Sequence, residues 1–365
     1  MSGHQSSSVD TVASASAVGP PPGMRVRLSS NESPIGPSPT AIEAAGRALA
    51  QGHRYPDDQS EVLRGALAAE YGRDEREVAV GNGSAALLMD AIAAVGAGGD
   101  VLAFERSFIV YRLAAANVSA RYVEVPTGPP PSVAGPGYIR DPERLLDAVG
   151  ARTRAVVLDN PGNPTGTHLA PDDLRELVTS IPEYLTVIID EAYRHFAVDD
   201  VDYATVEELG IDHPRLVVLD TFSKAHALAG LRIGVVRGPA ELVGHFDARR
   251  PRFNVTAPAQ AAALASLADR DHLAEVVAVT RAGRRRMADV LADAGVIYTD
   301  SRANFLTIEL GEAAGPTIAA FAQRGIGVRD LGAYGMHDQM RVTVGTAADV
   351  DAFLEAAAEI LPRRA

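Results

Sequence analysis

The sequence predicts an α/β protein in which a large domain, built on a mostly parallel sheet between helices, carries a smaller α+β domain. The first observation is length, because 365 residues exceed what one compact core usually holds. The second is that short continuous runs of Val, Ile and Leu alternate with helical patterns, which is typical of a parallel sheet covered on both faces. The third is a change after Pro258, where long helical patterns precede shorter strand candidates.

Four segments follow one another along the chain. Residues 1–24 are rich in Ser, Ala, Val, Gly and Pro and lack a basic stretch before an apolar core, so we expect a disordered tail and not a secretory signal. We expect residues 25–52 to form an N-terminal arm that packs with the small domain. Residues 53–265 should form the large domain and residues 266–365 the small C-terminal domain, and the expected compartment is the cytoplasm.

The elements expected in the large domain alternate between strand and helix. A short apolar run at 77–80 leads through Gly-Asn-Gly-Ser into a helix at 85–95. The strand at 100–104 precedes a helix at 111–117, and the strand at 155–159 precedes a helix at 171–180; further strands are expected at 185–190, 216–220 and 232–236. The small domain should contain a helical region at 259–294, interrupted near Asp269, then strands at 305–309, 327–330 and 340–344 and a last helix at 348–360.

Composition excludes several classes of function. The formal charge of −13 argues against nucleic acid or an anionic membrane as a partner, because both require a basic surface. The chain has no cysteine, which excludes disulfides, thiolate metal sites and cysteine nucleophiles. The sequence has no run of eighteen apolar residues, so it predicts no transmembrane helix.

Lys224 is the only lysine, and all other basic residues among the 34 Lys and Arg are arginines. Arginine stays protonated and cannot form a Schiff base, whereas a lysine whose site lowers its pKa can. Either this amine is kept for chemistry or it is a chance remainder of an Arg-rich composition.

Polar residues follow three of the expected strands at the point where each strand ends. They lie at 160–166, 190–193 and 221–224 and supply amide, carboxylate and amine groups. Ligands of parallel sheets bind at the carboxyl ends of strands, so the sequence predicts one site at this edge.

The motifs at these strand ends occur in the order found in fold-type-I pyridoxal-phosphate (PLP) aminotransferases. They are the turn at 159–166, the strand end at 190–193 and the stretch at 223–234. The chain resembles that family, and within it most resembles the histidinol-phosphate and aromatic amino acid aminotransferases, through matches at 31–39, 54–57, 81–84 and 341–346. The resemblance runs from about Leu28 to the last helix and implies a large PLP-binding domain.

The resemblance implies a role for each cofactor residue. Lys224 would form the Schiff base with PLP and move the proton between the substrate's Cα and the cofactor. Asp190 would pair with the pyridine nitrogen, whose protonated form a nearby carboxylate favours. Asn163 and Tyr193 would bond the 3′ oxygen, and Tyr111 would stack on the ring.

The phosphate requires hydrogen-bond donors and positive charge. By the same resemblance these come from the glycine-rich start of a helix, a hydroxyl and a guanidinium. The residues are Gly83, Ser84, Ala85, Ser223 and Arg232. Tyr55 would reach the phosphate of the neighbouring subunit, which implies a homodimer.

Four residues are expected beside the substrate. Arg341 matches the family's clamp for the α-carboxylate, a bidentate task that suits arginine, and Asn163, Ile35 and Gly36 would line the same region. Ile35 stands where histidinol-phosphate enzymes usually carry a tyrosine, so we expect an aromatic or apolar L-amino acid to be preferred over histidinol phosphate, with a 2-oxo acid as acceptor.

Two further departures from the family pattern concern the cofactor region. Ala85 and Ala86 replace the usual acidic pair, and His226 and Ala227 interrupt the aromatic-Gly that usually follows Ser-Lys-Ala. His226 would either touch substrate or serve a structural role.

Other functions compete with this interpretation. A dehydrogenase would use the loose GxGxxA pattern at 81–86 with Asp100 about twenty residues on, but it leaves Lys224 and Asp190 without a task. The nine histidines have no metal-ligand spacing, and no DNA-binding arm is present. A PLP-dependent lyase, decarboxylase or cyclase on the same scaffold stays open, because sequence does not fix which Cα bond stands perpendicular to the ring.

Overall fold

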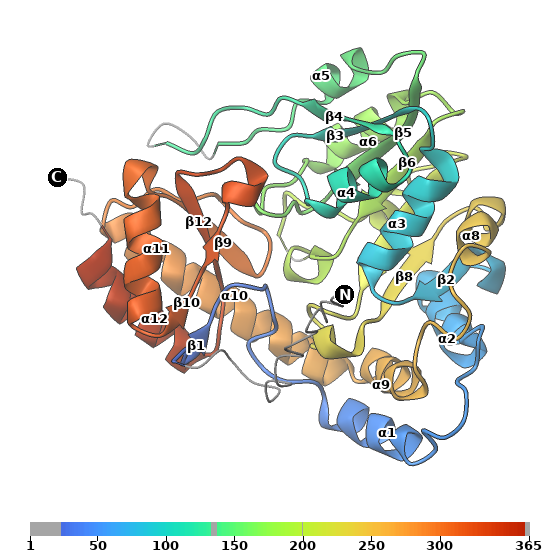
Figure 1. Cartoon of the computed structure of the whole chain (residues 1–365), viewed down its shortest axis with the longest axis horizontal. Helices are drawn as coiled ribbons and strands as arrows, with labels where there is room; N and C mark the ends of the chain where they lie inside the picture. The colour runs from blue at the N-terminus through green and yellow to red at the C-terminus, as the bar shows by residue number, and fades with distance from the viewer. Residues whose placement is uncertain (1–22, 133–136, 199, 362–365) are drawn as a thin grey trace, which may run out of the picture.

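The computed structural model describes residues 23–132, 137–198 and 200–361. The tail expected at 1–24 therefore lies outside the described residues, apart from Gly23 and Met24. Figure 1 shows the large domain beside a smaller domain formed by the C-terminal elements, with a long helix running between them. This arrangement confirms the predicted fold class.

The large domain is built on one sheet. Within the described residues seven strands hydrogen-bond in the order β2-β8-β7-β6-β5-β3-β4. Their bounds are β2 Val78–Gly81, β3 Asp100–Phe104, β4 Arg121–Val125, β5 Thr153–Asp159, β6 Thr186–Asp190, β7 Leu216–Thr221 and β8 Gly234–Arg237.

Helices cover both faces of this sheet, and alternate residues of each strand supply the two cores. On β3, Val101 and Ala103 face helices α3 (Ser84–Val95), α4 (Val110–Asn117) and α8 (Ala240–Asp247). Leu102 and Phe104 face helices α5 (Pro142–Asp147), α6 (Pro171–Ser180) and α7 (Val206–Leu209). A strand buried on both faces needs apolar residues at every position, which is why these strands read as continuous runs.

Strand direction differs from the prediction at one place. β8 pairs antiparallel with both β7 and β2, so the strand expected at 232–236 enters the sheet against its neighbours. The connection from β7 to β8, residues 222–233, contains the short turn Ala229–Leu231 but no α-helix, whereas a parallel connection crosses the sheet, usually through an α-helix. The edge strand β4 was not predicted, because its outward residues are polar and break the apolar run.

The small domain contains a three-stranded sheet, β11-β12-β9, flanked by helices. Its elements are β9 Phe305–Glu309, α11 Ala314–Gln323, β10 Ile326–Gly327, β11 Arg329–Asp330, β12 Gln339–Thr343 and α12 Ala347–Ile360. Helices α9 (Ala257–Ala268) and α10 (Arg270–Asp293) meet at Asp269, whose side chain accepts a hydrogen bond from the His272 backbone N–H at 3.2 Å. The predicted interruption near Asp269 is therefore confirmed.

The N-terminal arm contacts both domains. Strand β1 (Val26–Arg27) pairs parallel with β10, whereas helix α1 (Pro39–Leu49) packs against α9. Between them, residues 28–38 run past the carboxyl end of the large sheet, and α2 (Glu61–Tyr71) follows (Figure 1). The arm thereby carries backbone groups to the predicted site.

Candidate active site

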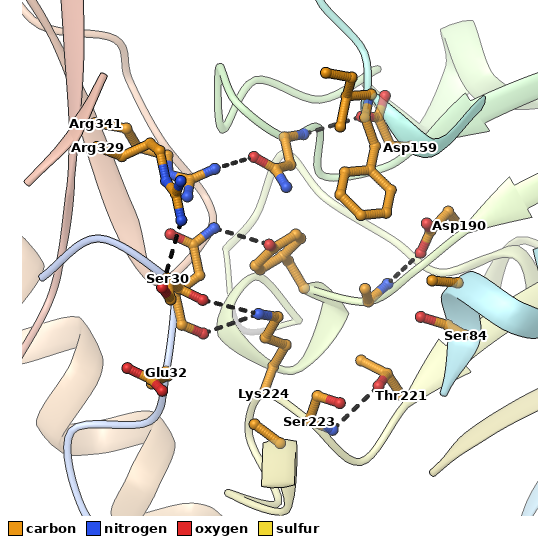
Figure 2. Close-up of a pocket in the computed structure, with 18 of the residues that line it drawn as sticks. Ser30, Glu32, Ser84, Asp159, Asp190, Thr221, Ser223, Lys224, Arg329 and Arg341 are labelled. Atoms are coloured by element: carbon orange, nitrogen blue, oxygen red, sulfur yellow. Dashed lines mark hydrogen bonds between the residues drawn. The ribbon is translucent and has the colours of Figure 1, made fainter. Parts of the chain in front are cut away.

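A cavity of about 530 Å³ opens at the carboxyl ends of the large-domain strands. The strand ends form its floor, the N-terminal arm forms one wall, and β11 and β12 of the small domain form another (Figure 2). Most of the predicted site residues line it: Ser84, Ala85, Asn163, Asp190, Tyr193, Ser223, Lys224, Arg232 and Arg341. The strand-end prediction is thus met geometrically.

Lys224 extends into the cavity from the turn that follows β7. Its Nζ donates to the carbonyl oxygens of Asn31 at 3.0 Å and Ser30 at 3.4 Å, both on the N-terminal arm (Figure 2). Loss of hydration lowers the pKa of Lys224 to about 8, and the neighbouring Arg341 guanidinium acts in the same direction. About one tenth of this amine is therefore uncharged at pH 7, far more than for a lysine in water, and the uncharged form is the nucleophile.

Asp190 ends β6 and is buried opposite Lys224. Its Oδ1 accepts from the Ala192 backbone N–H at 3.1 Å and its Oδ2 from the Tyr111 hydroxyl at 3.2 Å. Burial and, to a smaller extent, the nearby Asp159 carboxylate raise the pKa of Asp190 to about 7. A cationic group placed beside Asp190 would reverse that effect.

Asn163 connects the large domain to the small domain. Its Oδ1 accepts from Nη1 of Arg341, and its backbone N–H donates to Asp159 at 3.0 Å. Tyr193 accepts from the Asn31 side chain at 2.9 Å, and its ring centroid lies 5.7 Å from the Lys224 nitrogen. The amide, the phenol and the amine therefore face the same space.

Two arginines converge on the wall of the cavity opposite the strand ends. Arg341 on β12 is directly opposite Arg329 on β11, so both side chains lie on the same face of the small sheet. Both guanidinium groups donate to the Ser29 carbonyl oxygen, at 3.0 and 2.9 Å. Nε of Arg341 is buried and has no hydrogen-bond partner among the described residues. Two like charges at such close range favour an anion between them.

The start of helix α3 and the turn before β8 form a cup with space for a phosphate. Gly83 has φ of 81°, and a Cβ there would lie 2.5 Å from Nη2 of Arg232. A Cβ on Gly234 would lie 2.2 Å from the Ser84 backbone nitrogen. Arg232 Nη1 donates to Ser223 Oγ at 3.3 Å. Backbone N–H groups, a hydroxyl and a guanidinium thus meet at a helix N-terminus, a donor set that fits the phosphate of PLP.

Several predicted residues lie away from this cavity. Tyr111, the second residue of α4, is fully buried behind Asp190 and is not among the residues that line the cavity. Ile35 packs in an apolar cluster beside Tyr193, and the Gly36 carbonyl faces His272. Neither Ile35 nor Gly36 is among the residues that line the cavity.

Tyr55 is 83% exposed and stacks on Phe253 with ring centroids 4.7 Å apart. It is not part of its own chain's cavity, in keeping with the expectation that it acts on a neighbouring subunit. His226 is buried and bonds Ser266 Oγ at 2.9 Å, which favours its structural alternative.

Sequence reasoning missed several residues of the cavity wall, four of which have large side chains. Phe108 and Ile109 lie just before α4, and Tyr334 and Arg329 come from the small domain. Phe108 contacts Tyr111 edge-on at 5.9 Å, so it is the aromatic ring of this pair that faces the cavity. The sequence did contain a signal for Phe108. It stands between the end of β3 and the start of α4, so it lies on the loop at a strand end, where ligands bind.

Residues 23–132, 137–198 and 200–361 contain neither a candidate metal cluster nor a helix that could span a membrane. No group of three or more His, Cys, Asp or Glu side chains in them is placed to hold a metal ion. None of the helices in the same ranges is long and apolar enough to cross a membrane.

Known proteins resemble this chain over most of its length. The sequence profile of class I and II aminotransferases matches residues 24–356. Histidinol-phosphate aminotransferase 2 of Methylococcus capsulatus is 36% identical over 337 residues, which cover 92% of this chain and 90% of the relative. An aromatic amino acid aminotransferase of Thermobifida fusca is 39% identical over 338 residues, which cover 92% and 90%.

The fold is also shared with solved structures. The crystal structure of histidinol-phosphate aminotransferase from Sinorhizobium meliloti in complex with pyridoxal-5′-phosphate matches with a TM-score of 0.83 and 29% identity, covering 92% of this chain and 91% of that one. N-succinyldiaminopimelate aminotransferase from Mycobacterium tuberculosis matches with a TM-score of 0.81 and 27% identity, covering 92% and 93%.

Proposed function

This chain belongs to the class I and II aminotransferases and is a PLP-dependent transaminase, and from this premise we propose that its amino donor is an aromatic or apolar L-amino acid and its acceptor a 2-oxo acid. The buried guanidinium of Arg341 carries the proposal, because its unpartnered Nε leaves a donor for a carboxylate. Phe108, Ile109 and Tyr334 supply apolar surface on the same cavity. A donor with a carboxylate and an apolar side chain satisfies both.

We assign the binding of the cofactor to three groups of residues. The helix start at Gly83, Ser84 and Ala85 would hold the phosphate together with Ser223 and Arg232. Asp190 would hold the pyridine nitrogen, and Asn163 and Tyr193 would hold the 3′ oxygen. When bound, PLP supplies a conjugated ring that delocalises the electron pair left at the substrate's Cα.

Lys224 would act twice. Its uncharged amine would hold the cofactor, and once the substrate's amine has displaced it, the same nitrogen would take the proton from the substrate's Cα and deliver it to the cofactor's former aldehyde carbon. The depressed pKa of Lys224 supports both steps, since the amine has to exchange a proton near neutral pH. We also propose that Phe108, rather than Tyr111, covers one face of the ring, and that Tyr111 orients Asp190 through its hydroxyl.

Histidinol phosphate is the second candidate donor. The observation in its favour is that Arg329 stands directly opposite Arg341, because a doubly charged phosphate compensates two guanidinium groups better than one carboxylate does. The Ile35 argument against this donor weakens, since Ile35 packs in the apolar cluster beside Tyr193.

Tyr55 supports a homodimer as a further proposal. Its ring is exposed, and so are Ile42 and Leu49 on α1 and Val62 on α2, the helices that precede and follow Tyr55 in the chain. A partner subunit covering these side chains would bury apolar surface and bring the hydroxyl of Tyr55 toward a neighbouring phosphate cup.

The test is a half-reaction screen with PLP-loaded protein. Phenylalanine, tyrosine, leucine and histidinol phosphate are mixed with it singly, and conversion of the cofactor's aldehyde to the amine is followed by its visible absorbance. Arg341→Met and Arg329→Met serve as a matched pair. For phenylalanine we expect the Arg341 variant to lose roughly ten- to hundredfold in kcat/KM and the Arg329 variant to lose little.

The outcomes separate the candidates. If histidinol phosphate reacts about tenfold better than phenylalanine and both arginine variants lose it, the phosphate donor is correct and the first proposal is wrong. If no compound converts the cofactor while carbon dioxide or another elimination product is released, the lyase, decarboxylase or cyclase alternative takes its place.

A further inference from the structure

A buried ion pair lies directly behind the cavity floor. Nη2 of Arg140 donates to Oδ1 of Asp159 at 2.7 Å, and Nη1 donates to the carbonyl oxygen of the same residue. Their side chains are 2% and 4% exposed. Asp159 lines the cavity, whereas Arg140 stands behind it and touches neither donor nor cofactor space.

The Asp159 carboxylate joins the two loops that border the cavity. Its Oδ1 accepts from Ser107 Oγ at 3.1 Å, and its Oδ2 accepts from the Phe108 backbone N–H at 3.1 Å. Oδ2 also accepts from the Asn163 backbone N–H at 3.0 Å (Figure 2). One side chain therefore holds the backbone at Phe108 and at Asn163, from which the aromatic ring and the amide project.

The sequence leaves room for Arg140 at one specific place. A Cβ on Gly162 would lie 2.1 Å from Nη2 of Arg140, so any other residue there would displace the guanidinium. Tyr138 lies two residues before Arg140 in the chain. Its hydroxyl accepts from Nε2 of Gln339, and its ring packs against Leu331 and Met336 of the small domain. The segment 138–140 thus links the substrate wall to the strand end.

Charge explains why an arginine is needed. A carboxylate this deeply buried is costly without a counter-charge, and removing one partner of such a pair leaves the other uncompensated. Two charged groups act on Asp190, Asp159 on β5 and Asp220 on β7, and both raise its pKa. The Ala192 backbone N–H and the Tyr111 hydroxyl on α4 act in the opposite direction by donating hydrogen bonds to it. Arg140 is the cation that pairs with Asp159.

We propose that Arg140 is a positioning residue of the transamination: by orienting and neutralising Asp159 it holds Phe108 and Asn163 against the cofactor and keeps uncompensated negative charge away from Asp190. This inference rests on the proposed function, because it assigns those residues to the cofactor. It predicts that the charge balance of the pair, and not the presence of either side chain alone, sets cofactor affinity.

The test compares three variants with the parent. Arg140→Met removes the charge at similar length, and Arg140→Met/Asp159→Asn removes both charges. The Asp159→Asn change retains an amide oxygen that accepts from the Phe108 and Asn163 backbones. Arg144→Met is the control, because the Arg144 side chain is 58% exposed. PLP affinity of the cofactor-free protein, the visible absorption spectrum of the loaded protein and the thermal midpoint are measured for each.

We expect Arg140→Met to weaken PLP binding about ten- to hundredfold and to shift the balance of the visible bands, and the double variant to return within about threefold of the parent. Parent-like binding by Arg140→Met, or a double variant as defective as the single one, would overturn the inference. If Arg140→Met does not fold, Arg140→Gln and Arg140→Lys decide in its place: weaker PLP binding by the uncharged Gln variant than by the charged Lys variant supports the inference, and equal binding by the two overturns it. A parent protein that binds no PLP contradicts the proposed function instead.

Discussion

Replacing Asp190 by asparagine should stabilise the cofactor-free protein while it impairs the enzyme. Asn is isosteric with Asp and can keep both contacts, since its oxygen accepts from the Ala192 N–H and its amide group donates to the Tyr111 hydroxyl. What changes is the charge. The substitution removes a buried carboxylate that no described arginine or lysine contacts directly in a hydrogen bond or ion pair.

The magnitude follows from the pKa. Burial and Asp159 raise the pKa of Asp190 from 3.8 to about 7, so the folded protein holds a proton that the unfolded chain releases. Stability from this group is fully present below pH 3.8 and is lost as pH rises to about 7. At about 1.4 kcal/mol per pH unit, the free energy of unfolding of Asp190→Asn should exceed that of the parent by about 4 kcal/mol at pH 8. About 3 kcal/mol of this difference should develop between pH 5 and pH 8.

The assay is urea unfolding of cofactor-free protein at several pH values, with the exposed Asp293→Asn as a control for the substitution itself. Groups that the charge of Asp190 does not influence titrate equally in both proteins and cancel in the difference. The reasoning is refuted if the difference between Asp190→Asn and parent does not grow with pH. PLP affinity should fall roughly ten- to hundredfold in the same variant, since the pyridine nitrogen loses its charged partner.

Three further results are expected. Cofactor incorporation should accelerate about tenfold per pH unit up to about pH 8 and then level off, because Lys224 has a pKa of about 8 and reacts as the free amine; a flat rate in rapid mixing would contradict this. Gly234→Ala should weaken PLP binding by displacing the Ser84 backbone, whereas Gly244→Ala, with open space around its Cβ, should leave titrations unchanged. Tyr55→Phe should retain PLP poorly, and mixing it with Lys224→Ala should restore activity in hybrid dimers; a fully active monomer in sedimentation would exclude that.

Sequence predicted the parts of this protein that depend on local pattern. Continuous apolar runs identify β5, β6 and β7 because both faces of those strands are buried. Their carboxyl ends share one edge, so Asn163, Asp190 and Lys224 had to lie close together. Nothing in the local pattern gives the direction of β8, which depends on the length of the connection from β7.

The parts that sequence did not predict depend on distant pairing. Arg329 meets Arg341 only through the register of β11 with β12, and Arg140 meets Asp159 only after the chain between them has turned back. Phe108 and Tyr111 differ by a single helical turn, yet one faces the cavity and the other faces the back of Asp190. Which of these side chains faces the cavity depends on the direction of the backbone, and side-chain type alone does not specify that direction.

The solitary lysine also has an analytical consequence. Because Lys224 supplies the only ε-amino group of the chain, an amine-directed reagent has no surface lysines to consume. Apart from the α-amino terminus, each equivalent taken up reports one reacting cavity. Reactive aldehydes and cyanate would therefore inactivate this protein with a stoichiometry of one, and a bound cofactor would shield it completely. The fraction of competent molecules in a preparation can thus be counted by mass alone.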